Sequence, residues 1–462
     1  MISLLSKILP YLLLLYFLIR SLGKPIYLLG IPFLMFLRYC IFFENVKIFA
    51  VPGRFSADFL FAIWLIIFWI ILRIINTSQF SSKSSNFNSK NERNSLDYIV
   101  IGLIIISIID LVIVYVEYLN IENVFIEFFT IISLFFGYLI IKDVLRFYKP
   151  NLLSDFLFSI VLINSLASCL YILHQGLHLT IYKSDEYLSE IFQGEVITRT
   201  FWFMPPLWLF SICYLFVFKK HKPVIFFTLL IINLLALFIS YTRSFLVITI
   251  FLIILYYLLT AYKENNFYPA IKNIFLVALM GLFLFVAISK FFPASTNYFF
   301  YRFKELKQRP YDQSSNSLLY RFARTSEIIN RIDEDKLPLG YGPATSTQES
   351  SVYNMEITTH DLVWTGVVFR WGFIGLVLFV LLYLVSIFKA FSLFIKRDDI
   401  LSKLALLFLL VIVSQFIESF ISSTFLSSDR YAMGLWYIAI LSSLLLADKN
   451  YSDSTTKEQN HE

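Results

Sequence analysis

Long apolar stretches recur along the whole chain, and this recurrence constrains the fold more than any other feature of the sequence. There are about thirteen of them, and each is close to the roughly 20 residues that an α-helix needs to cross a membrane. They lie near residues 3–19, 25–43, 57–75, 97–116, 123–141, 151–173, 201–218, 223–240, 244–262, 271–290, 361–388, 404–424 and 431–447. We therefore predict an all-α, polytopic integral membrane protein with about 12–13 transmembrane helices.

The composition of the chain excludes several classes of protein. Of its 462 residues, 58% are hydrophobic and 15% are charged, whereas soluble proteins are typically about 25% charged. No water-soluble fold of this size buries so much apolar surface, which excludes a soluble enzyme, a secreted disulfide scaffold and an intrinsically disordered chain. The net charge of +6 is the excess of Lys and Arg expected of cytoplasmic loops, so we expect no nucleic-acid partner.

Positive charges recur on alternate loops and indicate how the chain is oriented. They cluster near residues 142–149, 219–222, 263–272 and 389–403, and the positive-inside rule assigns such loops to the cytoplasm. The predicted organisation is a set of transmembrane helices over 1–290 with a cytoplasmic Ser/Asn-rich linker at 76–96, a long outward-facing helical loop over 291–360, the last three transmembrane helices over 361–447, and a cytoplasmic tail over 448–462. The side of the membrane on which residue 1 lies stays open.

The long outward loop carries an unexpected positive charge. Between residues 302 and 331 it holds seven cations and three carboxylates. One interpretation is a solvated amphipathic helix. The other is an anion clamp that includes Arg302, Arg321 and Arg324, because guanidinium groups match phosphate oxygens in shape and charge.

Arg243 lies at the outer membrane boundary, between two apolar stretches joined by almost no loop. A charge at this depth is costly unless it faces a polar cavity, pairs with a partner or extends to the lipid headgroups. Arg199 and Arg370 lie near the same boundary, and Glu418 is a candidate counter-ion for one of these arginines. The sequence therefore predicts a second group of anion-binding residues.

His360 and Asp361 begin the first helix after the long loop. A histidine at this position is either a capping residue or a group that orients or deprotonates an acceptor hydroxyl. We predict no metal site, because His174 and His178 have no third ligand in the sequence and the acidic run 333–335 is typical of a solvated turn.

Several of these residues follow one another in an order that resembles a known family. The order is Ser240, Thr242 and Arg243, then a long outward loop with Arg321, then LPLGYG at 337–342, then His360, then Gly372 and Gly375; Arg199 with Pro205 and Pro206 precedes them. Over about residues 195–390 this pattern resembles the superfamily of O-antigen ligases and O-antigen polymerases.

The resemblance implies a metal-independent membrane glycosyltransferase without a cofactor. Its donor is a polyprenyl-pyrophosphate-linked oligosaccharide, and it acts at the periplasmic or exterior face of the bacterial inner membrane. By position, the resemblance assigns catalysis to His360, Arg243 and Arg321. From their charge and position, we expect the other residues to bind the pyrophosphate or the glycan: Arg199, Arg302, Arg324, Arg370, Asp361 and Glu418.

Three functions remain open on the sequence. The first is a surface-polysaccharide polymerase, and the second is a ligase that moves the same glycan to a lipid A core. The third is a transporter or flippase of lipid-linked glycan, which the mid-membrane Asp110 favours and the lack of an internal repeat disfavours. The expected partners are membrane lipid, the lipid-linked oligosaccharide, and chain-length regulator and flippase proteins.

Overall fold

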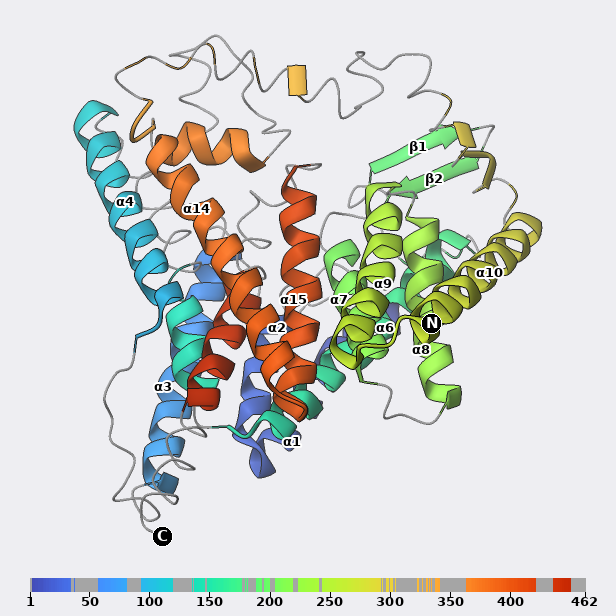
Figure 1. Cartoon of the computed structure of the whole chain (residues 1–462), viewed down its shortest axis with the longest axis horizontal. Coiled ribbons are helices and arrows are strands. Elements are labelled where there is room, and N and C mark those ends of the chain that lie inside the picture. The colour runs from blue at the N-terminus through green and yellow to red at the C-terminus, as the bar shows by residue number, and fades with distance from the viewer. Residues whose placement is uncertain are drawn as a thin grey trace. The chain divides into compact units, whose positions relative to one another are not determined.

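The fold is described from a computed structural model of the chain (Figure 1). The residues that the structure describes are 2–34, 37, 57–80, 93–118, 135, 137–145, 148–176, 179, 181, 188–192, 195–199, 204–218, 223–240, 243–291, a few single residues between 293 and 334, 337–340, 363–420 and 435–449. The chain divides into two compact units, Met1–Leu157 with Ile328–Glu462, and Phe158–Glu327. Each unit is described by itself.

The first unit is built from helices near both ends of the chain. Its helices are α1 (Ile2–Gly23), η1 (Pro25–Leu29), α2 (Gly30–Leu34), α3 (Ala57–Phe80), α4 (Ser95–Tyr118), the start of α6 (Pro150–Gly176), α14 (Val363–Lys396) and α15 (Ile400–Ser419). Helical backbone also covers 137–145 and 435–449. α14 packs against both α4 and α15. Only three residues join α14 to α15, so these two helices run antiparallel, and Asp399 caps α15 by accepting hydrogen bonds from Leu401 N and Ser402 N.

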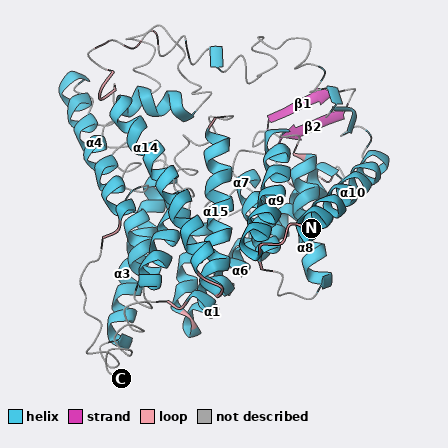
Figure 2. Ribbon diagram, viewed as in Figure 1, coloured by secondary structure: helices cyan, strands magenta, loops and turns pink. Residues whose placement is uncertain are grey.

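The second unit contains most of α6 and four further helices. These are α7 (Met204–Val217), α8 (Pro223–Ile239), α9 (Arg243–Glu264) and α10 (Tyr268–Phe291). A small antiparallel hairpin precedes them, formed by β1 (Leu188–Phe192) and β2 (Glu195–Arg199), with Leu188 opposite Arg199 (Figure 2). The hairpin lies in a segment that the sequence analysis treats only as an outward loop, and it is the one departure from helix among the described elements.

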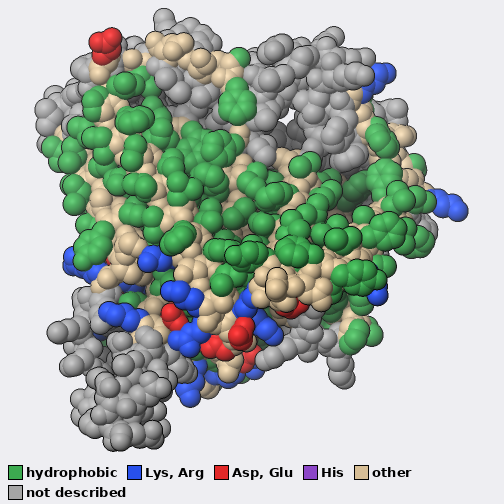
Figure 3. Space-filling model, viewed as in Figure 1, with side chains coloured by type: hydrophobic (Ala, Val, Ile, Leu, Met, Phe, Trp, Pro, Cys, Tyr) green, Lys and Arg blue, Asp and Glu red, His purple; other side chains and the backbone are tan. Residues whose placement is uncertain are grey.

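The helices have the length and hydropathy of a membrane protein. Five described segments are long and apolar enough to cross a membrane: Ser95–Val112, Pro150–Gln175, Ser244–Glu264, Trp371–Lys396 and Ile400–Ser419. Shorter apolar helices accompany them, and apolar side chains dominate the surface in view (Figure 3). The prediction of an all-α polytopic membrane protein is therefore confirmed. The predicted total of 12–13 helices includes stretches that lie outside the described residues.

α4 shows how a membrane helix sorts its two faces. Ile105, Ile108 and Val112 are exposed on one face, as expected of side chains in contact with lipid. The opposite face is buried and includes Ser107 and Asp110. Polar side chains on a membrane helix face the protein interior because hydrocarbon offers them no hydrogen bonds.

A buried polar clamp holds the first turn of α4. Asp97 forms an ion pair with Lys142 and accepts hydrogen bonds from Tyr138 Oη (2.8 Å) and Asn94 N (2.7 Å). The side chain of Asn94 donates to Ser442 Oγ at 2.8 Å. This clamp therefore ties α4 to the 137–145 helix and to the last described helix, 435–449.

We predict that Asp97→Asn lowers the stability of the protein by about 3 kcal/mol, because it leaves the buried Lys142 ammonium without its counter-ion. The side chains of this pair are only 3% and 12% exposed. Thermal unfolding in detergent measures the effect.

The matched control is Asp155→Asn, which breaks the exposed pair of Lys24 and Asp155, whose side chains are 42% and 61% exposed. The control should cost at most about 1 kcal/mol, because solvent already screens this pair. If the two variants lose the same stability, the buried clamp stabilises the protein no more than the exposed ion pair does.

Candidate functional site

The structure describes the predicted site residues to different extents. Glu418 is described completely, whereas only the backbone is described for Arg199, Arg243 and Arg370. The other predicted site residues lie outside the described part: His360, Asp361, Arg302, Arg321 and Arg324. Arg199 and Arg243 belong to the second unit, and Arg370 and Glu418 belong to the first.

The first unit brings the helix segments of Arg370 and Glu418 to the same end. The Trp364 ring, near the start of α14, packs against Phe416 and Phe420 at the end of α15, with ring centroids 5.8 and 4.8 Å apart. Glu418 lies between these two phenylalanines in sequence and is 2% exposed. Arg370 follows Trp364 by six residues on α14. That both residues lie near one membrane boundary stays a prediction.

A turn at residues 337–340, in the second half of the long loop, packs onto a break in α14. At Gly372 the backbone leaves the helical conformation, with φ +60° and ψ −163°. The amides that follow the break donate to the turn instead of to their own helix, from Phe373 to the Leu337 carbonyl (2.9 Å) and from Ile374 to the Pro338 carbonyl (3.2 Å). In Figure 1 the part of α14 before the break runs at an angle to the remainder.

Glycine is required at this contact for two reasons. A Cβ at Gly372 would lie 2.4 Å from the carbonyl carbon of Pro338, and the positive φ disfavours any other residue. Gly375, one turn further along α14, is also restricted, because a Cβ there would lie 2.2 Å from the Cβ atom of Trp371. Leu337 and Pro338 of the LPLGYG phrase and Gly372, which belong to two separate motifs in the sequence, therefore lie on the two sides of one backbone contact.

We predict that Gly372→Ala destabilises the protein by about 3 kcal/mol or more, because it adds backbone strain to a clash with the Pro338 carbonyl. Gly281→Ala is the matched control, since a Cβ at Gly281 in α10 meets nothing within 4 Å. The control should be neutral or stabilising, as Ala favours a helix over Gly. Thermal unfolding in detergent compares the two variants, and equal stability would contradict the described contact.

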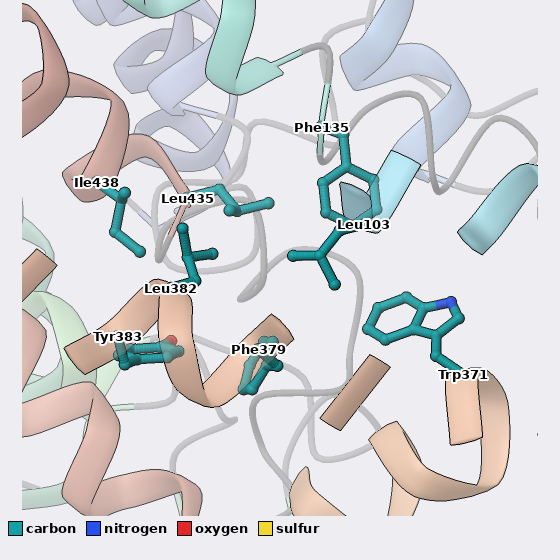
Figure 4. Close-up of a pocket in the computed structure, with 8 residues that line it drawn as sticks. All are labelled: Leu103, Phe135, Trp371, Phe379, Leu382, Tyr383, Leu435 and Ile438. Carbon is teal, nitrogen blue, oxygen red and sulfur yellow. The ribbon is translucent and has the colours of Figure 1, made fainter. Parts of the chain in front are cut away.

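An apolar cavity lies below this break, inside the first unit (Figure 4). It is lined by Leu103, Phe135, Trp371, Phe379, Leu382, Tyr383, Leu435 and Ile438. No carboxylate and no cation is among these lining residues, so the cavity itself offers no positive charge for phosphate binding.

Asp110 and Ser107 are two buried polar side chains on α4. They are 1% and 0% exposed, and neither carboxylate oxygen of Asp110 has a hydrogen-bond partner among the described residues. In a membrane helix such a residue marks a functional position by default. Asp110 is therefore a candidate functional residue in the structure, as it is in the sequence.

The second unit contains a buried polar cluster that the sequence analysis misses. Asn164 Nδ2 on α6 lies 2.7 Å from Ser211 Oγ on α7 and 3.2 Å from Asn233 Oδ1 on α8. Asn233 Nδ2 in turn donates to Ser165 Oγ at 2.8 Å. The signal was present, because Asn164 and Asn233 each interrupt an apolar stretch. Uncharged side chains that hydrogen-bond between membrane helices are packing contacts, so this cluster joins α6, α7 and α8.

Arg243 is the first residue of α9, and only three residues separate it from the end of α8. The positive end of the helix dipole disfavours a cation at this position, and the first turn of α9 contains no acidic residue to offset it. The side chain of Arg243 lies outside the described part of the structure. A helix N-terminus with an added guanidinium is instead a favourable place for an anion.

Of the residues considered for a metal, His178, Asp333 and Asp335 lie outside the described residues. His174 Nδ1 lies 3.0 Å from the Leu179 carbonyl and 3.2 Å from the Ile181 amide, so this side chain contacts the backbone that follows α6. Across the described ranges no three His, Cys, Asp or Glu side chains form a group that could hold a metal ion. Comparison with known proteins adds no assignment: no protein-family model matches the chain, and no curated protein is significantly similar to it.

Proposed function

We propose that this chain is a surface-polysaccharide polymerase of the O-antigen type. It transfers glycan from a polyprenyl-pyrophosphate-linked donor to a sugar hydroxyl at the outer face of the bacterial inner membrane. The observation that carries the proposal is Arg243 at the N-terminus of α9, next to a very short turn. Two sources of positive charge meet there, and the pyrophosphate of a membrane-bound donor is an anion held at this same depth.

The chemistry needs cations more than it needs a metal. The sugar hydroxyl attacks C1 of the donor, a new glycosidic bond forms, and the bond from C1 to the pyrophosphate oxygen breaks. Negative charge then builds on the leaving pyrophosphate, where Arg243 and Arg321 stabilise it as fixed guanidinium groups. His360, with Asp361 beside it, accepts the proton of the acceptor hydroxyl.

The remaining proposed residues bind rather than react. Arg199, Arg302, Arg324 and Arg370 hold the pyrophosphate and the glycan, and Glu418 serves as the counter-ion of one boundary arginine. Glu418 is 2% exposed at the end of α15, which supports a role that depends on a nearby positive charge. Chain-length regulator and flippase proteins are the partners that such a polymerase requires.

A transporter of lipid-linked glycan is the second candidate function. The observation in its favour is Asp110, a carboxylate that is buried in a membrane helix and has no hydrogen-bond partner in the described part of the chain. A ligase remains a third possibility, because it uses the same donor and differs only in its acceptor.

The direct test incubates the purified protein with a polyprenyl-pyrophosphate oligosaccharide and a chelator. We expect lengthened lipid-linked glycan and released polyprenyl pyrophosphate. Transfer only to added lipid A core would establish the ligase. Movement of the donor across liposomes without a new glycosidic bond would establish the transporter.

We predict that Arg243→Ala lowers the transfer rate by about 10²–10³-fold, because it removes one fixed donor to the leaving pyrophosphate. Arg243→Lys should recover only part of the rate, since an ammonium lacks the two-pronged geometry of a guanidinium. The matched control is Lys263→Ala, which removes a cation from the last turn of the same helix. If both alanine variants transfer glycan at the wild-type rate, Arg243 has no catalytic role.

A further inference from the structure

The end of α8 is buried where the chain turns toward Arg243. Ile239 and Ser240 are both 0% exposed. The last carbonyls of a helix have no partner within the helix, and here neither water nor lipid can satisfy them. Ser240 supports the earlier carbonyls, because its amide donates to Ala236 O at 3.0 Å and its hydroxyl donates to Leu237 O at 2.6 Å.

A side chain from another helix satisfies the final carbonyl of α8. Tyr171 on α6 donates from its hydroxyl to the Ile239 carbonyl at 3.3 Å. Tyr171 is 1% exposed, so this bond forms inside the second unit. The last residue of α8 is thereby attached to α6, just before the three-residue turn.

Tyr171 is itself held in place by Trp208 on α7. Their rings pack with centroids 5.8 Å apart at an angle of 37°. The Trp208 indole N–H donates to Ser168 Oγ at 2.7 Å, and Ser168 lies one turn before Tyr171 on α6. Trp208 is 0% exposed. The two aromatic residues therefore form a brace between α6 and α7 that ends on the last carbonyl of α8.

The brace continues into the buried polar cluster. Ser168 Oγ also lies 3.3 Å from Asn233 Oδ1, on α8 itself. α8 is thus held at its middle by Asn233 and at its end by Tyr171. Because three residues leave the α8–α9 turn little freedom, the position of the end of α8 determines where α9 begins.

We infer that Tyr171 and Trp208 are positioning residues, which hold the α8–α9 turn so that Arg243 begins α9 at the place where the donor pyrophosphate binds. The inference rests on the proposed function. Displacing a catalytic group by about 1 Å is enough to cost a large factor in rate, and a turn this short transmits any movement of Ile239.

The test compares two single-atom changes. Tyr171→Phe removes the hydroxyl that reaches Ile239 and keeps the ring. Tyr138→Phe is the matched control, since Tyr138 is also 0% exposed and also donates one hydrogen bond, but to Asp97 in the other unit. Both variants are purified in detergent and assayed with the polyprenyl-pyrophosphate oligosaccharide.

We expect Tyr171→Phe to lower kcat about tenfold with the KM for the donor unchanged within about twofold, as for a misplaced catalytic group in an intact binding site. Hydrogen–deuterium exchange of residues 240–248 should become faster in this variant and stay unchanged in Tyr138→Phe. Trp208→Phe, which keeps the ring contact but loses the N–H bond to Ser168, should fall between wild type and Tyr171→Phe.

The outcomes separate the inference from the function on which it rests. If exchange at residues 240–248 is unchanged in Tyr171→Phe, or if both Tyr→Phe variants lose the same kcat, the inference is overturned and the polymerase proposal stands. If wild-type protein transfers no glycan, the polymerase proposal fails. The inference that Tyr171 and Trp208 position Arg243 for catalysis then fails as well. Faster exchange together with a selective loss of kcat supports both.

Discussion

The need to satisfy every backbone amide and carbonyl inside hydrocarbon governs this protein. Where water is absent, an unpaired peptide group costs several kcal/mol, so the chain crosses the membrane as helices. The few places where a helix ends or breaks at depth then need partners from elsewhere. Tyr171 provides one for the last carbonyl of α8, and the Leu337–Pro338 carbonyls provide two for the amides after Gly372.

These two supported irregularities lie close in sequence to the residues of the proposed chemistry. Arg243 follows the braced end of α8, and Arg370 precedes the break at Gly372. Helix interiors offer a reacting pyrophosphate only side chains, whereas helix ends and breaks also expose oriented backbone groups. A membrane enzyme that handles a charged group at the bilayer boundary gains most from positions of this kind, provided that the backbone around them is held by other elements.

Much of the fold follows from local pattern, and much of the site does not. Apolar stretches of about 20 residues predict helices correctly because each one satisfies its own backbone. Asn164 and Asn233 stood out in the sequence as polar interruptions, but nothing local shows that they meet across 69 residues. The same holds for Leu337 and Pro338 of the LPLGYG phrase. They contact α14 next to Gly372, although this helix begins more than 20 residues later in the chain.

By itself, the sequence determined that this is an all-α membrane protein, which residues carry charge at its boundaries, and which family pattern their order resembles. These properties depend on hydropathy and spacing, which are local. Only the tertiary structure decided that Gly372 must be glycine, that Glu418 is buried, and that Tyr171 holds the turn before Arg243. Each of these depends on which distant peptide group or ring comes to lie against the residue, and no local pattern encodes such a meeting.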